Sequence, residues 1–317
     1  MLSRVADAIY WASRYVERAE NVARFVDVNL NLMLDAPNGQ RPSWEPLVQT
    51  SGDQEYFKKR YGEATKEAVT HFLTFDRDYP NSILSALSYA RENAQTVREV
   101  ISREMWRELN SLYLFVKDTA ATKGSASPEE MIEFYNRVKL AGIYYEGVTD
   151  ATLSRGEAWY FARLGRMLER ADKTSRILDV KYFILLPTTR DIGTTTDQVG
   201  WSALLNSASA LQMYRQRYHV LAPSNVAEFL LLDRDFPRSI HYCLLSAQDS
   251  LHKLSGTPHD RHSNPAERLI GQLRARLDYA DIEQVMTEGL HEYLDELQST
   301  LNEIGQAVDV RFFHPAW

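Results

Sequence analysis

An internal repeat constrains the fold of this chain more than any other feature of its sequence. Residues 14–21, Arg-Tyr-Val-Glu-Arg-Ala-Glu-Asn, recur as residues 166–173, Arg-Met-Leu-Glu-Arg-Ala-Asp-Lys, at an offset of 152 positions. A second match, at an offset of 157, aligns residues 226–237 with residues 69–80. Repeated units of this kind bury their apolar faces against one another. We therefore predict one domain over residues 1–317, made of repeat 1 (1–150) and repeat 2 (153–317).

Helical periodicity fills most of both repeats. Apolar residues recur every three or four positions along residues 4–34 and again along residues 83–112, which is the period of an amphipathic helix. The 14 glycines and 11 prolines are too few for the turns of an all-β fold of this length. The sequence thus predicts an all-α fold, with long antiparallel helices in a duplicated, pseudo-two-fold helical bundle.

Cap and turn signals predict the bounds of several elements. One helix is expected over residues 81–118, bent near Glu104, with Asp78 as its cap and Pro80 in its first turn. A polar loop rich in threonine is expected over residues 187–200, and two further helices between about residues 264 and 309. The Asp-Arg-Asp turns at 76–78 and 233–235 lack the spacing of a calcium loop and are interpreted as structural helix caps.

Composition narrows the functional classes. The formal net charge of −7 disfavours nucleic-acid binding through a basic surface. The single cysteine, Cys243, allows no intramolecular disulfide, which fits a reducing compartment, and its apolar neighbours indicate an inert core thiol. No apolar run of signal-peptide type opens the sequence, and residues 182–186 are too few to cross a bilayer. We expect a cytoplasmic protein that binds neither nucleic acid nor membrane.

The charges of residues 14–21 lie opposite the apolar stripe of their helix, which is typical of a solvated face with intrahelical ion pairs. A second observation favours an interior position. Phe25, Val28 and Leu32 lie at the same azimuth as the charges, and Ile177, Val180 and Ile184 do the same in the second repeat. Because a helix that is apolar on both sides is enclosed, we expect the charges to line a crevice or an interior layer.

Buried charges must be paired and hydrogen-bonded. Two interpretations remain open for this layer: a structural ion network across the pseudo-axis, and a site for an anionic ligand, because the arginine fork that binds carboxylate side chains also binds phosphates and substrate carboxylates. The residues concerned are Arg14, Glu17, Arg18, Arg24, Arg166, Glu169, Arg170 and Arg176.

A polar stripe on the predicted helix 81–118 occurs in one repeat only. Its members recur at spacings of three and four residues: Arg91, Gln95, Arg98, Ser102, Trp106 and Asn110. Where the first repeat has Arg91, Glu92 and Asn93, the second has Gln248, Asp249 and Ser250. An acidic ligand is therefore expected in the half that holds Arg91 and Arg98, unless this helix only forms ion pairs with Glu17 or Asp27.

Recognised catalytic and metal motifs are absent from the sequence. Di-iron bundles need two Glu-x-x-His pairs, and the chain has one, ending at His291. His259 and His262 fall in a predicted loop and are expected to be solvated. Phosphate-loop, nucleophile-elbow and Cys-x-x-Cys patterns do not occur. No catalytic residue, metal site or cofactor is predicted.

Several motifs together carry a resemblance to a known family. They are Leu2-Ser3-Arg4, Tyr10-Trp11, Arg14-Tyr15, Glu17-Arg18-Ala19-Glu20, Arg24, Arg91-Glu92-Asn93-Ala94, Val97-Arg98, Trp106, Asn110, Leu164-Gly165-Arg166 and Leu168-Glu169-Arg170-Ala171. On these motifs nearly the whole chain resembles the bacterial alpha-E family, with Ala12-Ser13 as one departure. The resemblance implies an all-α protein found beside, or fused to, a circularly permuted ATP-grasp protein. Transglutaminase-like peptidases and a proteasome-like hydrolase are further implied companions.

Three functions follow as hypotheses. The first is an accessory or substrate-presenting component of an ATP-grasp-linked system that forms or modifies peptide or amide bonds. The second is an enzyme of that system, with Glu17 or Glu169 as acid or base and arginines holding an anionic substrate. The third is a structural helical protein that forms a homo-oligomer through exposed Trp or Tyr residues.

Overall fold

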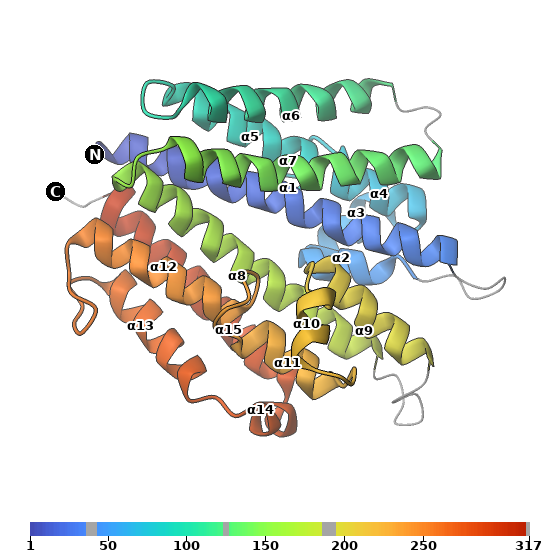
Figure 1. Ribbon diagram of the computed structural model, residues 1–317. Helices are drawn as coiled ribbons and strands as arrows, with labels where there is room; N and C mark the ends of the chain where they lie inside the picture. The colour runs from blue at the N-terminus through green and yellow to red at the C-terminus, as the bar shows by residue number, and fades with distance from the viewer. Residues whose placement is uncertain (36–42, 123–126, 186–194, 315–317) are drawn as a thin grey trace. The chain divides into compact units, whose positions relative to one another are not determined.

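The computed structural model describes residues 1–35, 43–122, 127–185 and 195–314. Within these ranges the chain forms fifteen α-helices, one short π-helix and no strand, so the predicted all-α class is confirmed (Figure 1). The helices are α1 (Ser3–Asp35), α2 (Glu45–Ser51), α3 (Gln54–Tyr61), α4 (Lys66–Thr74), α5 (Ile83–Thr96), α6 (Arg103–Ala121), α7 (Pro128–Thr152), α8 (Glu157–Leu185), α9 (Thr195–Ser207), α10 (Leu211–Arg217), α11 (Pro223–Leu232), α12 (Ile240–Ser255), α13 (Pro265–Asp278), α14 (Ile282–Glu288), α15 (Leu290–Val308) and the π-helix Asp309–Phe313.

The chain divides into two compact units. The first, here the N-unit, is Ala8–Ala162; the second, here the C-unit, is Arg163–Trp317 together with Met1–Asp7. The organisation as one domain of two repeats, with bounds 1–150 and 153–317, stays a prediction. Among the helices described, none is both long enough and apolar enough to cross a membrane.

The N-unit contains a helical hairpin where one long helix was predicted. Residues 97–102 leave the helix, and α6 then packs back against α5 (Figure 1). Ser102 caps the new helix, because its Oγ accepts a 3.1 Å hydrogen bond from the Met105 backbone N–H. The single helix 81–118 with a bend near Glu104 is therefore wrong: the chain reverses direction instead of bending.

The cap of α5 also differs from the prediction. Ser82, not Asp78, caps this helix, and its Oγ accepts a hydrogen bond from the Ser85 N–H at 3.1 Å. Asp78 is exposed and lies four residues before the cap. The carboxylate that organises the turn is that of Asp76, which accepts the Asp78 backbone N–H at 2.9 Å.

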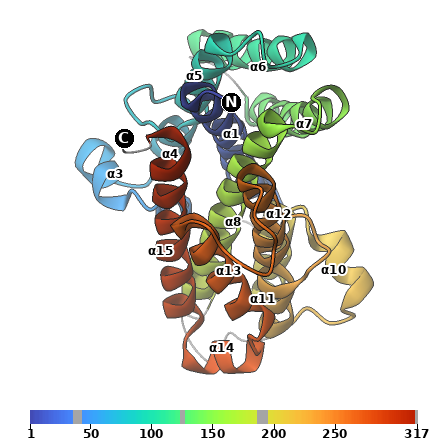
Figure 2. The same cartoon turned by 90° about the vertical axis from the view of Figure 1, so that its left-hand side faces the viewer.

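The C-unit places α13 between α12 and α15 (Figure 2). Three α-helices follow residue 264, not the two predicted, because Gly289 at φ +122° separates α14 from α15. Only glycine adopts such a backbone conformation readily. The predicted polar loop 187–200 is helical from Thr195 onward, and the rest of it lies outside the described residues.

Each unit contains an aromatic cluster built by corresponding residues. In the N-unit the Phe72 ring stacks on Tyr79 with centroids 3.8 Å apart. In the C-unit Phe229, 157 positions later, stacks on Phe236 at 4.8 Å. Corresponding rings extend both clusters, Phe57 and Tyr61 in the N-unit and Tyr214 and Tyr218 in the C-unit. Tyr56 adds a further ring in the N-unit.

Candidate functional site

The charged stretch of α1 is mostly buried, as the sequence predicted. Glu17 is 2% exposed and Arg24 is 5% exposed. Their partners include residues one turn away: Asn21 Nδ2 donates to Glu17 Oε1 at 2.8 Å, and Arg24 Nη2 donates to Glu20 Oε1 at 2.5 Å. Arg24 is thus charge-paired and Glu17 hydrogen-bonded within their own helix, which lowers the cost of burying them.

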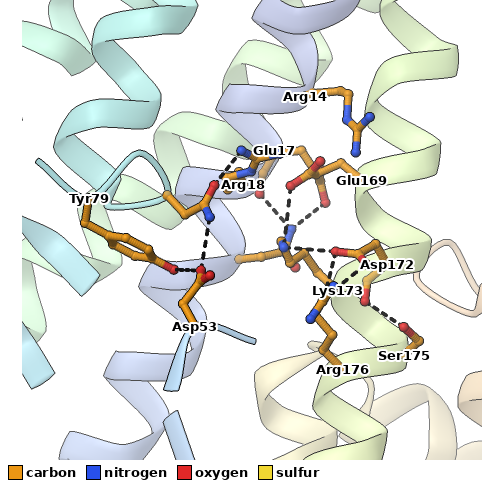
Figure 3. Close-up of polar contacts among 12 residues, drawn as sticks. Arg14, Glu17, Arg18, Asp53, Tyr79, Glu169, Asp172, Lys173, Ser175 and Arg176 are labelled. Atoms are coloured by element: carbon orange, nitrogen blue, oxygen red, sulfur yellow. Dashed lines mark hydrogen bonds and ion pairs between the residues drawn. The ribbon is translucent and has the colours of Figure 1, made fainter. Parts of the chain in front are cut away.

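Arg18 is half-buried and begins a chain of polar contacts within the N-unit (Figure 3). Its Nη1 donates to Asn81 Oδ1 at 2.7 Å, and Asn81 Nδ2 donates to Asp53 Oδ2 at 3.3 Å. The Tyr79 hydroxyl donates to the same Asp53 oxygen at 2.7 Å. Burial, reinforced by the Asp53 charge, raises the pKa of Tyr79, so the phenol stays protonated and keeps donating.

Sequence reasoning missed Asp53, Tyr79 and Asn81, because they come from two turns that meet only in the folded unit. Comparison of the two repeats is the one sequence signal that bears on these three residues. The positions 157 residues later are Ala210, Phe236 and Arg238, so this polar group is specific to the N-unit.

Arg14 packs on aromatic rings of its own helix. Its Nη1 donates to the Tyr10 hydroxyl at 3.1 Å, and its guanidinium lies 4.8 Å from the Trp11 ring centroid. Arg18 lies 5.3 Å from the Tyr15 ring in the same way. Cation–π contacts of this kind hold a guanidinium in place without neutralising its charge.

The repeated stretch on α8, in the C-unit, is buried to a similar degree. Arg166, Glu169 and Arg170 are 7%, 0% and 3% exposed. Arg170 Nη1 donates to the Pro237 backbone carbonyl at 3.4 Å. The predicted ion network between these residues and the charges of α1 stays a prediction.

Asp172 is the centre of the ion pairs on α8 (Figure 3). Lys173 Nζ lies 2.9 Å from its carboxylate and Arg176 Nε lies 3.0 Å away. Burial alone raises the pKa of the Asp172 carboxyl, but these two cations outweigh it and hold the pKa below its ordinary value. Asp172 and Arg176 occupy the positions of Glu20 and Arg24 in the first repeat, and both pairs are ion pairs.

A second corresponding pair lies near the ends of the same two helices. In the N-unit Lys139 Nζ of α7 lies 2.6 Å from Asp27 Oδ2. In the C-unit His291 Nδ1 of α15 lies 2.7 Å from Asp179 Oδ1. Each pair is separated by 112 residues along the chain. His291 Nε2 also lies 3.6 Å from Asp295 Oδ2.

The hairpin of α5 and α6 brings together most of the predicted polar stripe, although by chain reversal and not along one helix. Arg91 Nε donates to Asn110 Oδ1 at 2.8 Å. The guanidinium groups of Arg91 and Arg98 lie 5.6 Å and 4.8 Å from the Trp106 ring centroid.

Two more residues extend this group. Arg91 lies 5.2 Å from the Tyr113 ring, and Lys117 Nζ lies 5.9 Å from the same ring. We call this set the arginine–aromatic cluster: Arg91, Arg98, Trp106, Asn110, Tyr113 and Lys117.

Two of the predicted site residues do not join the cluster. Glu92 is exposed and accepts a hydrogen bond from Ser88 Oγ at 3.2 Å. The backbone carbonyl of Asn93 accepts from Thr96 Oγ1 at 2.8 Å. Both contacts are local ones within α5.

The two Asp-Arg-Asp turns differ as helix caps: Asp233 is the C-cap residue of α11, whereas Phe75 and Ser82 cap the helices on either side of the first turn. Asp76 is 3% exposed and accepts a 2.7 Å hydrogen bond from the Tyr61 hydroxyl. Burial and the Asp76 carboxylate raise the pKa of Tyr61 to about 12. In the C-unit Asp233 pairs with Arg217, just as Asp76 pairs with Arg60. The buried carboxylates of Asp76 and Asp233 are thus held by contacts within their own units.

The family comparison rests on nearly the whole length of the chain. Residues 1–313 match the Alpha-E family, described as a predicted alpha-helical domain with a conserved ER motif. The chain belongs to the Alpha-E family. It carries Glu-Arg at 17–18 and again at 169–170, in corresponding positions of α1 and α8. The resemblance inferred from the sequence motifs is therefore confirmed.

The relatives of this Alpha-E chain include two mycobacterial proteins. The uncharacterised protein Rv2567 of Mycobacterium tuberculosis is 24% identical over 314 residues, which is 93% of this chain and 34% of the relative. The uncharacterised protein Mb2597 of Mycobacterium bovis matches to the same extent. The chain thus spans about a third of the length of these relatives. No solved structure matches the chain.

Proposed function

We propose that this Alpha-E chain is an accessory or substrate-presenting component of an ATP-grasp-linked system that forms or modifies peptide or amide bonds. Its partner is the circularly permuted ATP-grasp protein, with a transglutaminase-like peptidase as a further companion. The reducing, ATP-containing cytoplasm is the proposed compartment.

The observation that carries this proposal is the arginine–aromatic cluster of the N-unit. Arg98 and Lys117 are exposed, and Arg91, Trp106 and Tyr113 are half-buried. Arginine and tryptophan dominate the energetics of protein–protein interfaces. Since the two guanidinium groups rest on aromatic rings, they are held in place for a carboxylate or an acidic side chain at little entropic cost.

The lengths of the relatives support a component role. In the two mycobacterial proteins the matched region is about a third of the chain. In those longer relatives the matched region is joined to other parts of the same chain. We infer that a chain made of this region alone associates with a separate protein instead.

We infer further that the two units are diverged copies of one helical unit, arranged as a duplicated pseudo-two-fold bundle of long antiparallel helices. Corresponding contacts support this: α10, α11 and α12 begin 157 residues after α3, α4 and α5. The pairs Asp27–Lys139 and Asp179–His291 correspond at an offset of 152. In the C-unit Gln248 stands in place of Arg91, so we place recognition in the N-unit.

Association of the two purified proteins tests the proposal. The full chain and the circularly permuted ATP-grasp protein are mixed at micromolar concentration, with and without Mg-ATP, and analysed by size-exclusion chromatography with light scattering. A complex of defined mass is expected in at least one condition. Separate elution in both conditions contradicts the proposal.

An enzyme that binds an anionic substrate is the alternative. Glu17 and Glu169 are 2% and 0% exposed, which argues against either as a general acid or base, since a substrate must reach within hydrogen-bond distance. Arg14 and Arg18 are more exposed than these glutamates. Turnover by the isolated chain that is lost in Glu17→Gln would favour the enzyme.

A structural role through self-association is the third alternative. Leu140, Ile143 and Tyr144 form an exposed apolar strip on α7, and they are 66%, 48% and 54% exposed. Such a strip is a candidate surface for a homodimer. Sedimentation at two concentrations tests it, and a concentration-independent monomer argues against it.

A further inference from the structure

We infer that Asp179, His291 and Asp295 form a binding site for one divalent transition-metal ion of the zinc class. All three residues lie in the C-unit, with Asp179 on α8 and the other two one turn apart on α15. One ligand atom from each lies within 4.8 Å of the other two. Imidazole nitrogen and carboxylate oxygen are ligands that zinc takes in proteins.

The spacing of the ligand atoms is close to what such an ion needs. His291 Nδ1 lies 2.7 Å from Asp179 Oδ1. Two ligand atoms at about 2.1 Å from a tetrahedral ion are separated by about 3.4 Å. Small rotations of the His291 and Asp179 side chains, which are 31% and 17% exposed, provide that widening. Water completes the coordination, since three protein ligands leave one position open.

The corresponding place in the N-unit gives the internal comparison. At an offset of 152 residues, Asp179, His291 and Asp295 correspond to Asp27, Lys139 and Ile143. Lys139 and Asp27 form a simple ion pair at 2.6 Å, and isoleucine has no ligand atom.

This difference points to a ligand. A lysine is sufficient to neutralise the aspartate, as the N-unit shows. The C-unit instead has a histidine and adds a second carboxylate on the same helix, and one ligand atom of each of the three residues lies within 4.8 Å of the other two. The change from lysine to histidine, with the added carboxylate, exchanges an ammonium, which cannot bind a metal ion while protonated, for two groups that can.

Other charged residues lie close to the three ligands. Glu292 of α15 adds a third carboxylate whose charge acts on His291. Arg176 of α8 is the cation that acts on Asp179. Among the residues whose side chains the structure describes, Asp179, Glu292 and Asp295 supply carboxylates here and Arg176 a guanidinium, and Asp295 is 62% exposed. The site does not depend on the proposed ATP-grasp partner.

Metal titration of the untagged full chain tests the site. Isothermal titration with Zn²⁺, and Co²⁺ absorption as an independent readout, measure affinity and stoichiometry. We expect one ion per chain and a rise in the unfolding midpoint, because the ion binds only the folded pair of helices. No binding of either ion at micromolar concentration overturns the inference.

Three variants make the result specific. His291→Lys reproduces the pair of the N-unit, so the fold is kept while the imidazole ligand is removed, and affinity is expected to fall more than about tenfold. Asp295→Asn is expected to weaken binding in the same direction. His259→Ala is the control, since this exposed histidine lies 3.6 Å from Asp249 outside the site, and its binding should match that of the wild type. Equal affinity in the wild type and His291→Lys overturns the inference.

Discussion

Gly142 of α7 lies directly against the side chain of Glu20 of α1. A Cβ atom added to Gly142 would lie 2.9 Å from Glu20 Cγ and 3.0 Å from Glu20 Cβ. Neither of these atoms is the free end of a flexible chain. This contact sets the spacing of two N-unit helices where the buried Glu20–Arg24 pair lies.

Gly142→Ala is therefore expected to lower the free energy of unfolding by about 1–3 kcal/mol, because overpacking displaces a buried ion pair. Gly147→Ala, on the same helix, has nothing within 4 Å of its new Cβ. It is expected to stabilise by about 0.5–1 kcal/mol through helix propensity alone. Urea denaturation of both variants measures the difference, and equal effects of the two would contradict the close contact.

The two aspartates of the first Asp-Arg-Asp turn are expected to differ sharply. Asp76 is buried and accepts from Tyr61 and from the turn backbone, so Asp76→Ala should cost about 1–3 kcal/mol by leaving those donors unpaired. The Asp78 side chain is 70% exposed and contacts only the exposed Arg60 among these groups. Asp78→Ala should change stability by less than about 0.5 kcal/mol. Thermal unfolding compares them; a larger loss for Asp78→Ala would refute this account of the turn.

His241 predicts a pH dependence in the C-unit. It is 1% exposed, and its ring nitrogens lie 3.2 Å from the Leu232 carbonyl and 3.0 Å from Asp278. Burial lowers the pKa of His241, although the hydrogen bond with the Leu232 carbonyl and the Asp278 charge act in the opposite direction.

The sign follows from linkage. With a lowered pKa in the folded state, the unfolded chain binds more protons at this residue, so its contribution to stability falls as pH drops below the ordinary histidine value of about 6.5. His241→Gln removes this dependence. As the pH falls from about 7.5 to about 5.5, the unfolding free energy of the wild type should decrease relative to that of the variant. A difference that is constant with pH would count against a lowered pKa.

Helix content and burial of the charged stretch follow from the sequence because both depend on periodicity. Apolar residues on two faces of α1 indicate that Glu17 and Arg24 are enclosed, and they are. The hairpin does not follow from this reasoning. Val97 and Ile101 keep the helical period through the turn and are buried, so the pattern continues where the helix does not.

Ser102 also contributes to the wrong prediction of one continuous helix. In the sequence it fits the polar stripe, whereas in the structure it caps α6. Hydrophobic periodicity also cannot predict contacts between two turns, such as the hydrogen bond from Tyr79 to Asp53. The correspondence between the pairs Asp27–Lys139 and Asp179–His291 can be read from the sequence, because the repeat offset of 152 aligns them. The contact within each pair is seen only in the folded chain.

Binding of the ATP-grasp protein by cluster variants tests the central claim most directly. Arg98 and Trp106 lie in the arginine–aromatic cluster. Arg107, which is on α6 like Trp106, is 69% exposed and pairs with Glu108. Dissociation constants are measured for wild type, Arg98→Ala, Trp106→Ala and the matched control Arg107→Ala. The account predicts at least about tenfold weaker binding for the first two variants and wild-type affinity for Arg107→Ala. Unchanged affinity of Arg98→Ala and Trp106→Ala, or an equal loss in Arg107→Ala, would contradict it.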